Sequence, residues 1–206
     1  EWATRLGYPV IETPHVNDSS IVQRIRGFQA RLGIVIAFGQ KLGAEVIRSM
    51  PCGCVNLHAS LLPKYRGAAP INWAVLRGEE KTGVTVFRLT DRIDAGDVLV
   101  RRETMIRPDE TAGELHDRLA MIGPDAIDAT IRLFWRLDDP PGIPQDNSQV
   151  SIAPKLTKEN GLLDFHMPAS HLARQIRAMN PWPGGRCQYR SAANQKSEEV
   201  TLCRAQ

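Results

Sequence analysis

The chain has 206 residues, of which 42% are hydrophobic and 24% are charged, and its formal net charge at pH 7 is +3. This composition excludes a disordered chain, a collagen-like repeat and a minimal disulfide scaffold, and the length allows a sizeable hydrophobic core. The sequence contains no run of about eighteen consecutive apolar residues, so we expect no membrane-spanning helix and no membrane partner. A small positive charge does not by itself indicate a nucleic-acid partner.

The cysteine content and the start of the chain bear on its origin. Four cysteines without a secretory signal favour reduced thiols and a cytoplasmic location, in a bacterium or an organellar matrix. The chain begins Glu1-Trp2 without an initiator Met, so we expect that the natural protein starts earlier.

The first elements predict a strand-helix-strand unit. Apolar residues at helical spacing follow Asp18 and Ser19, and predict a helix from Ile21 to Leu32 that ends at Gly33. The unbroken apolar run 34–38 predicts a strand buried on both faces. A helix over 42–50 and a second strand over 54–58 complete a βαβ unit, so we expect a parallel sheet.

The next elements continue the α/β pattern. We expect a helix over 70–76, a strand over 83–87 and another strand that begins at Val98. Thr111 and Glu114 form a capping-box pattern, which predicts a long helix to about Trp135 with an interruption at Gly123-Pro124.

The pattern changes after a linker that is rich in proline. Residues 138–144 read Asp-Asp-Pro-Pro-Gly-Ile-Pro. Beyond them we expect a helix over 169–179 and short strands near Cys187 and Val200. This second module ends at Gln206, and its length is too small for a typical β-rich domain, so we expect it to be incomplete.

Polar side chains gather at the expected ends of two strands. Asn56 and His58 share one face of the strand 54–58, and Asp94 follows the next strand. Because open α/β sheets place ligands at the carboxyl ends of their strands, we expect the three to meet there. An amide and an imidazole can stabilise an oxyanion, and a carboxylate can keep the imidazole charged and accept a proton. The set suits acyl transfer.

Other kinds of site are less well supported. Cys52, Cys54 and His58 could bind zinc, but no fourth ligand stands at a familiar spacing. We expect the two cysteines to be buried, reduced and free of metal. The segment 78–83 lacks the pattern of a phosphate-binding loop, and no dinucleotide-binding glycine motif occurs.

One long segment is distinctive. Residues 56–71 read Asn-Leu-His-Ala-Ser-Leu-Leu-Pro-Lys-Tyr-Arg-Gly-Ala-Ala-Pro-Ile and closely resemble the signature of the folate-dependent formyltransferases. Residues 82–86 and 94–97 match the same family, including the spacing between His58 and Asp94. Residues 153–159 and 177–184 resemble the branch that acts on methionyl-tRNA. The resemblance covers essentially the whole chain.

The resemblance implies a role for particular residues. Asn56, His58 and Asp94 match the catalytic trio of the family. The residues that match the tetrahydrofolate-binding segment are Ser60, Leu61, Leu62 and Pro63, and those that resemble the loop beside the pterin ring are Ala37, Phe38, Gly39 and Gln40. The implied co-substrate is 10-formyltetrahydrofolate, and no metal is implied.

The resemblance also implies a fold and a reaction. The fold is α/β, with an open, Rossmann-like and mostly parallel sheet followed by a partial β-rich barrel. Residues 1–137 would form the catalytic domain without its N-terminal part, 138–156 a linker, and 157–206 an incomplete barrel-like domain that helps hold tRNA. The enzyme would act as a monomer and transfer a formyl group to the α-amino group of initiator methionyl-tRNA, for translation initiation. A strand and a basic substrate loop that normally come first in this family would be missing.

Two alternatives stay open. A sugar-nucleotide formyltransferase would use the same folate donor, and Asn72-Trp73 resembles that branch somewhat. A folate- or RNA-binding remnant without catalysis would also fit a shortened chain. If the second module holds tRNA, its basic residues would face phosphates. These are Lys155, Lys158, Arg174, Arg177, Arg186, Arg190, Lys196 and Arg204.

Overall fold

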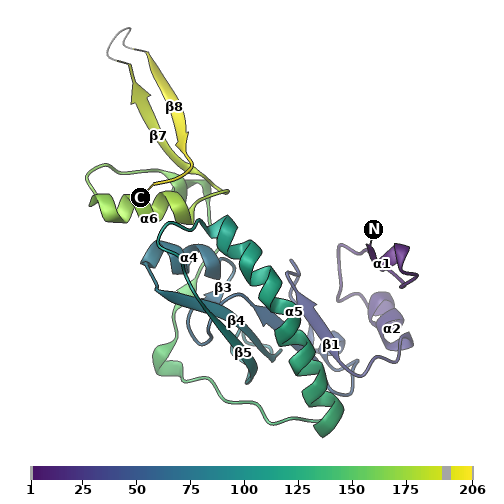
Figure 1. Ribbon diagram of the computed structural model, residues 1–206. Coiled ribbons are helices and arrows are strands. Elements are labelled where there is room, and N and C mark those ends of the chain that lie inside the picture. The colour runs from purple at the N-terminus through teal and green to yellow at the C-terminus, as the bar shows by residue number, and fades with distance from the viewer. Residues whose placement is uncertain (1, 192–195, 206) are drawn as a thin grey trace.

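A central sheet of four strands organises the computed structural model, which describes residues 2–191 and 196–205. The strands lie in the order β1-β2-β4-β5, and their bounds are β1 Gly33–Ile36, β2 Cys54–His58, β4 Lys81–Arg88 and β5 Val98–Met105. The long helix α5 (Ala112–Leu137) crosses one face of this sheet (Figure 1). Three short helices precede β2, namely α1 (Trp2–Arg5), α2 (Ser19–Gly27) and α3 (Ala44–Ile47).

The strand directions confirm the βαβ unit and modify the rest of the expected sheet. β1 and β2 are parallel, with Ile36 opposite Leu57. β4 runs antiparallel to β2, and β5 antiparallel to β4, so this part departs from the mostly parallel arrangement that we expected. The reason lies in the connection after β2: α4 (Pro70–Arg77) packs on α5 and α6 and does not cross the sheet, so the chain re-enters the sheet from the end that it has just left.

The strand β1 is less buried than its apolar sequence predicted. We expected burial on both faces, but Ile36 is 54% exposed and Phe38, just beyond the strand, is 45% exposed. β1 has only β2 as a strand neighbour in the described sheet, and α5 packs on β4 and β5. One face of β1 is therefore open in the described part of the chain.

Several predicted helices change their bounds, and α3 covers only Ala44–Ile47 of the expected 42–50. α2 ends at Gly27 and not near Leu32, and Gln29 follows with a φ of 53°, a left-handed conformation that stops a helix. α5 begins with the predicted capping box of Thr111 and Glu114. It continues without a break through Pro124, because this residue lies on the exposed face, where water can bind the carbonyl group that the proline leaves unpaired.

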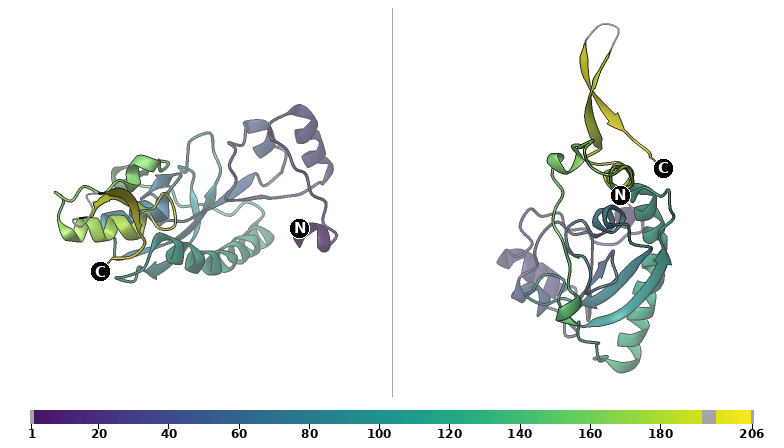
Figure 2. Two further views of the ribbon diagram at one scale, coloured as in Figure 1. Left: turned by 90° about the horizontal axis from the view of Figure 1, so that it is seen from above. Right: turned by 90° about the vertical axis from the view of Figure 1, so that its left-hand side faces the viewer.

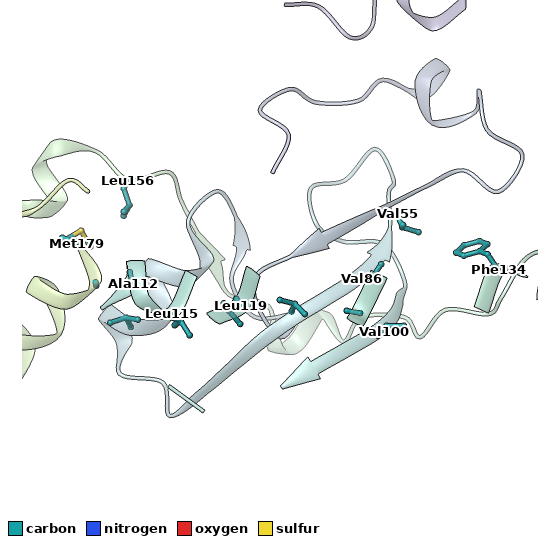
Figure 3. Packing of buried hydrophobic residues seen from close by; sticks show 13 residues of the cluster. Val55, Val86, Val100, Ala112, Leu115, Leu119, Phe134, Leu156 and Met179 are labelled. Atoms are coloured by element: carbon teal, nitrogen blue, oxygen red, sulfur yellow. The ribbon is translucent and has the colours of Figure 1, made fainter. Parts of the chain in front are cut away.

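The hydrophobic core lies between α5 and the sheet. Figure 3 shows Val55, Val86 and Val100 on the strands opposite the side chains of α5. Leu115 and Leu119 are almost fully buried in this layer. Leu156 and Met179 continue the same cluster into the C-terminal part, so the two modules share one core.

The segment that follows α5 returns across the first module. Ile143 pairs with Val98, and β6 (Ile152–Ala153) pairs in parallel with the two-residue strand β3 (Arg66–Gly67). We call residues 143–153 the strap; it includes a 3-10 turn over Asn147–Gln149. The sequence predicted neither β3 nor β6, since two-residue strands have no detectable periodicity.

The second module is small and elongated. It contains a 3-10 turn (Lys158–Gly161), α6 (Ala169–Ala178) and the antiparallel strands β7 (Gly185–Arg190) and β8 (Ser197–Leu202). The right view of Figure 2 shows the strands β7 and β8 projecting away from the body, so a small antiparallel sheet stands where we expected a partial barrel. No helix in the described ranges has the length and apolar character needed to cross a membrane.

Candidate active site

The last residue of β2, His58, stands at the centre of the candidate site. Strand alternation places Asn56 and His58 on one face of β2, as predicted, and Val55 on the other face, in the core beneath α5. The His58 side chain is buried, with 7% of its surface exposed. Its ring packs edge-on against Phe87 of β4, with 6.4 Å between the ring centroids.

Both nitrogens of the His58 ring face a polar group. Nε2 lies 2.8 Å from the carbonyl oxygen of Tyr65. Because a carbonyl oxygen only accepts hydrogen bonds, Nε2 carries a hydrogen. Nδ1 faces Oδ2 of Asp94 at 3.7 Å, which is longer than a hydrogen bond. Nδ1 is therefore the nitrogen that can gain a proton beside the carboxylate, or hydrogen-bond to a reacting group.

Asp94 reaches His58 by a route that the sequence did not predict. We expected both at the same end of a parallel sheet, but β4 is antiparallel, and Arg88 at its end pairs with Val55 near the start of β2. The loop after β4 therefore folds back toward His58. The six residues from Leu89 to Asp94 can span up to about 20 Å, so the return is within reach.

The carboxylate of Asp94 is held by the backbone of β3. Oδ2 accepts a hydrogen bond of 2.8 Å from the N–H of Gly67, and 14% of the Asp94 side chain is exposed. Gly67 has a φ of 123°, and a Cβ atom there would lie 2.5 Å from the carbonyl oxygen of Ala153. Only glycine fits this position without displacing the strap.

The amide of Asn56 is free to act on a ligand. Asn56 is half-buried, and its side chain has no hydrogen-bond partner within residues 2–191 and 196–205. A half-buried amide N–H without a partner, two residues from His58 on the same face, is suited to stabilise a negative oxygen.

The segment 60–63 turns partly inward. Ser60 and Leu62 are fully buried: the hydroxyl of Ser60 donates to the carbonyl of Lys64, and Leu62 packs against Phe87. Leu61 and Pro63 are half-buried. The hydroxyl of Thr85 donates to the carbonyl of Ser60 and accepts from the N–H of Leu62, which fixes the loop on β4. Of these four residues, Leu61 and Pro63 can offer a side chain to a ligand.

Phe38 and Gly39 lie at the same edge of the sheet as His58. They follow β1 directly, and since Ile36 is opposite Leu57, the loop after β1 begins beside His58. Both residues are exposed. The register thus brings the two predicted ligand loops, after β1 and after β2, to the carboxyl ends of these two parallel strands.

Tyr65 and Glu79 stabilise the turn that supports His58. The Tyr65 hydroxyl donates to Glu79 at 2.7 Å, and the Arg77 guanidinium lies over the Tyr65 ring. Burial, together with this carboxylate, raises the pKa of Tyr65. Burial alone would raise the pKa of Glu79, but the hydrogen bonds from Tyr65 and Lys64 outweigh it and lower that pKa. The turn therefore holds an ionised carboxylate.

The two cysteines near β2 differ from each other. Cys54 is buried as predicted, and burial raises the pKa of its thiol to about 11. Cys52 is only half-buried, which corrects our expectation, because it stands before β2, where its thiol contacts the carbonyl of Asp138. Both are free thiols, and the described residues contain no group of His, Cys, Asp or Glu positioned to bind a metal.

Two cavities of similar volume lie away from His58, where the two modules meet. One has a volume of about 890 Å³, between the first turns of α4 and α5 and the C-terminal residues. The other has about 930 Å³ and is lined by α6 and the end of β5, with Arg174 and Arg177 on its wall.

Sequence reasoning missed three groups around His58. The carbonyl of Tyr65 and the N–H of Gly67 belong to the signature segment, but their role is carried by the backbone and no side-chain pattern reveals it. Gln145 contacts the Asp94 loop from the strap, and it stands in a polar, proline-rich stretch with no sequence signal.

Two family models match the chain, and curated relatives match most of its length. The model described as formyl transferase matches residues 9–131, and the one described as formyl transferase, C-terminal domain, matches residues 155–206. The chain is 43% identical to the methionyl-tRNA formyltransferase of Trichlorobacter lovleyi over 184 residues, which is 89% of this chain and 58% of that protein. It is 39% identical to the methionyl-tRNA formyltransferase of Solibacter usitatus, covering 98% of this chain and 66% of that protein. The chain thus spans less than two thirds of these relatives.

Solved structures share the fold. The structure of HypX from Aquifex aeolicus in complex with tetrahydrofolic acid superposes with a TM-score of 0.69 at 22% identity, covering 80% of this chain and 28% of that one. A sugar N-formyltransferase from Shewanella sp. gives a TM-score of 0.76 at 16% identity, covering 100% of this chain and 80% of that one. The described geometry, the family models and the relatives lead to one assignment: the chain belongs to the formyl transferase family.

Proposed function

We propose that the full-length protein transfers a formyl group from 10-formyltetrahydrofolate to the α-amino group of initiator methionyl-tRNA. The observation that carries this proposal is the pair of the buried His58 and the partly buried Asp94 beside the free amide of Asn56. The acceptor is inferred from the relatives, several of which are named methionyl-tRNA formyltransferase at about 40% identity.

The proposed reaction needs an oxyanion site and a route for protons. The nitrogen of the neutral amine attacks the formyl carbon, a C–N bond forms and the formyl oxygen becomes an oxyanion. The Asn56 amide and the protonated Nδ1 of His58 donate hydrogen bonds to this oxygen. Asp94, which lies 3.7 Å from Nδ1, stabilises the imidazolium and helps accept the amine proton.

The second half of the reaction regenerates the site. The bond between the formyl carbon and N10 of the folate breaks, and N10 takes up a proton. The products are formylmethionyl-tRNA and tetrahydrofolate. Nε2 of His58 keeps its hydrogen and donates it in a hydrogen bond to the Tyr65 carbonyl throughout. The ring therefore exchanges protons only through Nδ1.

We place the folate at the sheet edge formed by the loops after β1 and β2. Phe38 and Gly39 are exposed there, and Leu61 and Pro63 are the half-buried members of the neighbouring segment. Ser60 and Leu62 act from within, by shaping this loop. A tetrahydrofolate complex of a protein with this fold supports folate as the co-substrate.

We further propose that the two modules have different roles. Residues 1–137 would carry the reaction, 138–156 would connect, and 157–206 would help hold the tRNA. The cytoplasmic location and monomeric state expected from the sequence stay predictions.

The acceptor decides between this proposal and its alternatives. The full-length protein is incubated with 10-formyltetrahydrofolate and either methionyl-tRNA, an amino-sugar nucleotide or no amine, and release of tetrahydrofolate is measured. Release that depends on methionyl-tRNA supports the proposal. Release only with the amino-sugar nucleotide supports the sugar branch, and no release with either acceptor supports a binding remnant.

A further inference from the structure

Gln145 uses every hydrogen-bonding position of its side chain to join the strap to the Asp94 loop. Its Nε2 donates to the carbonyl of Asp94 at 2.9 Å and to that of Gly96 at 2.7 Å. Its Oε1 accepts from Nε and Nη2 of Arg66, at 3.1 and 2.8 Å. An amide offers two N–H groups and one oxygen with two lone pairs, so all four positions are occupied.

The backbone of Asp94 needs such support. Its φ is 48°, a left-handed conformation that costs free energy in a residue other than glycine. Gln145 holds the carbonyl of Asp94, while the N–H of Gly67 holds its carboxylate. The residue is thus fixed from both sides, in the conformation that brings the carboxylate to His58.

Arg66 closes the network. It belongs to β3, whose next residue is Gly67, and its N–H donates to the carbonyl of Ser151 in the strap. Burial lowers the pKa of Arg66, and the negative charge of Asp94 opposes that shift. The contacts run from Arg66 to Gln145, from Gln145 to Asp94, and from Asp94 back to Gly67.

We propose that Gln145 is a positioning residue: from the segment between the modules, it holds the Asp94 loop so that the carboxylate faces Nδ1 of His58. This inference rests on the proposed function for its catalytic consequence. The positioning itself is a property of the chain that can be measured without any reaction.

Amide hydrogen exchange tests the positioning directly, because the N–H of Gly67 donates to Asp94 and to no other described group. In the 206-residue chain, Gln145→Ala should raise the exchange rate of the Gly67 amide by about tenfold or more. The amides of Arg66 and Ala69 donate to the carbonyls of Ser151 and Ala153 and should keep their rates. Asp94→Ala sets the upper limit for Gly67.

A second variant separates the two sides of the amide. Gln145→Glu can still accept from Arg66 but has no N–H for the loop carbonyls, so it should raise the Gly67 exchange rate as Gln145→Ala does. If either variant leaves the Gly67 rate unchanged, the inference is overturned. It is also overturned if the rates of Arg66 and Ala69 rise equally, because that result shows a general loosening of the strap.

The catalytic consequence is measured in the full-length protein. Gln145→Ala and Gln145→Glu should lower kcat by about tenfold or more, with KM for folate and for acceptor unchanged, since a small displacement of a reacting group affects chemistry more than binding. Unchanged kcat would overturn the role in catalysis. If the Gly67 rate rises as expected but the unaltered protein formylates no acceptor, the positioning stands and the proposed function falls.

Discussion

The carbonyl oxygen of Tyr65 lies 2.8 Å from Nε2 of His58, seven residues earlier in the chain. Tyr65 has a φ of 62°, so the backbone turns back toward β2 and points this carbonyl at the ring. The contact fixes which nitrogen carries the hydrogen and leaves Nδ1 to face Asp94. A local turn therefore sets the chemistry of the histidine before any substrate binds.

The first prediction concerns the reacting pair. In the full-length protein, His58→Ala or Asp94→Asn should lower kcat about a hundredfold or more, because each removes a group that stabilises charge in the transition state. Folate binding, measured by titration, should be largely kept. The matched control is His116→Ala, an exposed histidine whose one polar partner among the described residues is Asp117. Near-normal turnover in both site variants would show that the pair is not catalytic.

The second prediction concerns the close contact of β3 with the strap. Gly67→Ala should destabilise the chain by about 2 kcal/mol, since it combines an unfavourable φ with a clash against Ala153. Gly27→Ala is the control, because a Cβ atom there meets no atom within 4 Å. Urea unfolding of both variants measures the difference. A Gly67→Ala chain as stable as the control would mean that the backbone of the strap does not pack closely against Gly67.

The third prediction concerns the ion pair between Arg118 of α5 and Glu110, which lies just before this helix. The guanidinium of Arg118 donates to both oxygens of Glu110, whose side chain is 2% exposed. Burial alone would raise the pKa of Glu110, but the hydrogen bonds from Arg118 and from the backbone N–H of Arg107 outweigh it and lower that pKa. Arg118→Ala should therefore cost about 3 kcal/mol, because it removes the charged partner of a buried carboxylate and leaves it the N–H of Arg107. The double variant with Glu110→Ala should recover part of this loss in urea unfolding, and an absence of recovery would contradict the account.

The sequence was sufficient for the elements that depend on local patterns. The capping box of Thr111 and Glu114, the limits of β2, and the shared face of Asn56 and His58 all follow from side-chain type and spacing. These features depend on hydrogen bonds and alternation within a few residues, so a single chain without relatives reveals them.

The sequence was not sufficient for features that depend on contacts between distant parts of the chain, such as the burial of β1 and the direction of β4. An apolar run such as that of β1 is typical of a buried strand, but burial depends on which elements pack against it, and β1 has one strand neighbour in the described sheet. The direction of β4 depends on where α4 packs, and this is a tertiary choice. The prediction that Asp94 meets His58 was confirmed, although its stated reason, a shared strand end, was wrong.

The fourth prediction concerns acid stability. The backbone N–H of Thr111 and the side chain of Arg204 both donate to Glu114, and they lower its pKa to about 2. Because the folded pKa lies below the ordinary value of 4.5, the stability from this carboxylate is fully present above pH 4.5 and is lost as the pH falls through about 2. Glu114→Gln should lower Tm at pH 7 and reduce its fall between pH 5 and pH 2. Glu198→Gln, on the exposed part of β8, is the control. Equal pH profiles for Glu114→Gln and the unaltered chain would contradict this assignment.

The basic residues of the second module differ in how far they are already paired. Arg186 and Arg204 form ion pairs with Glu199 and Glu114. Arg174 and Arg177 both line the cavity of about 930 Å³. The Nε atom of each is buried without a hydrogen-bond partner among the described residues, as is that of Arg186, but only Arg186 of these three forms an ion pair in the described part of the chain. Burial and the charge of Arg174 together lower the pKa of Arg177, so a negative group between the two arginines would relieve their repulsion.

The last prediction therefore places a tRNA phosphate at Arg174 and Arg177. Substitution of either by Glu in the full-length protein should weaken tRNA binding, and the log–log slope of affinity against salt should become shallower by about 0.7 to 0.9 for each phosphate that is no longer neutralised. KM for the folate should not change, because we place that site at the edge formed by β1 and β2. Arg186→Glu is the matched control: it makes the same change of charge at an arginine that is already paired with Glu199, and it should change the slope less. Filter binding across a salt series measures the slopes, and an unchanged slope in both Arg174→Glu and Arg177→Glu would show that the tRNA is held elsewhere.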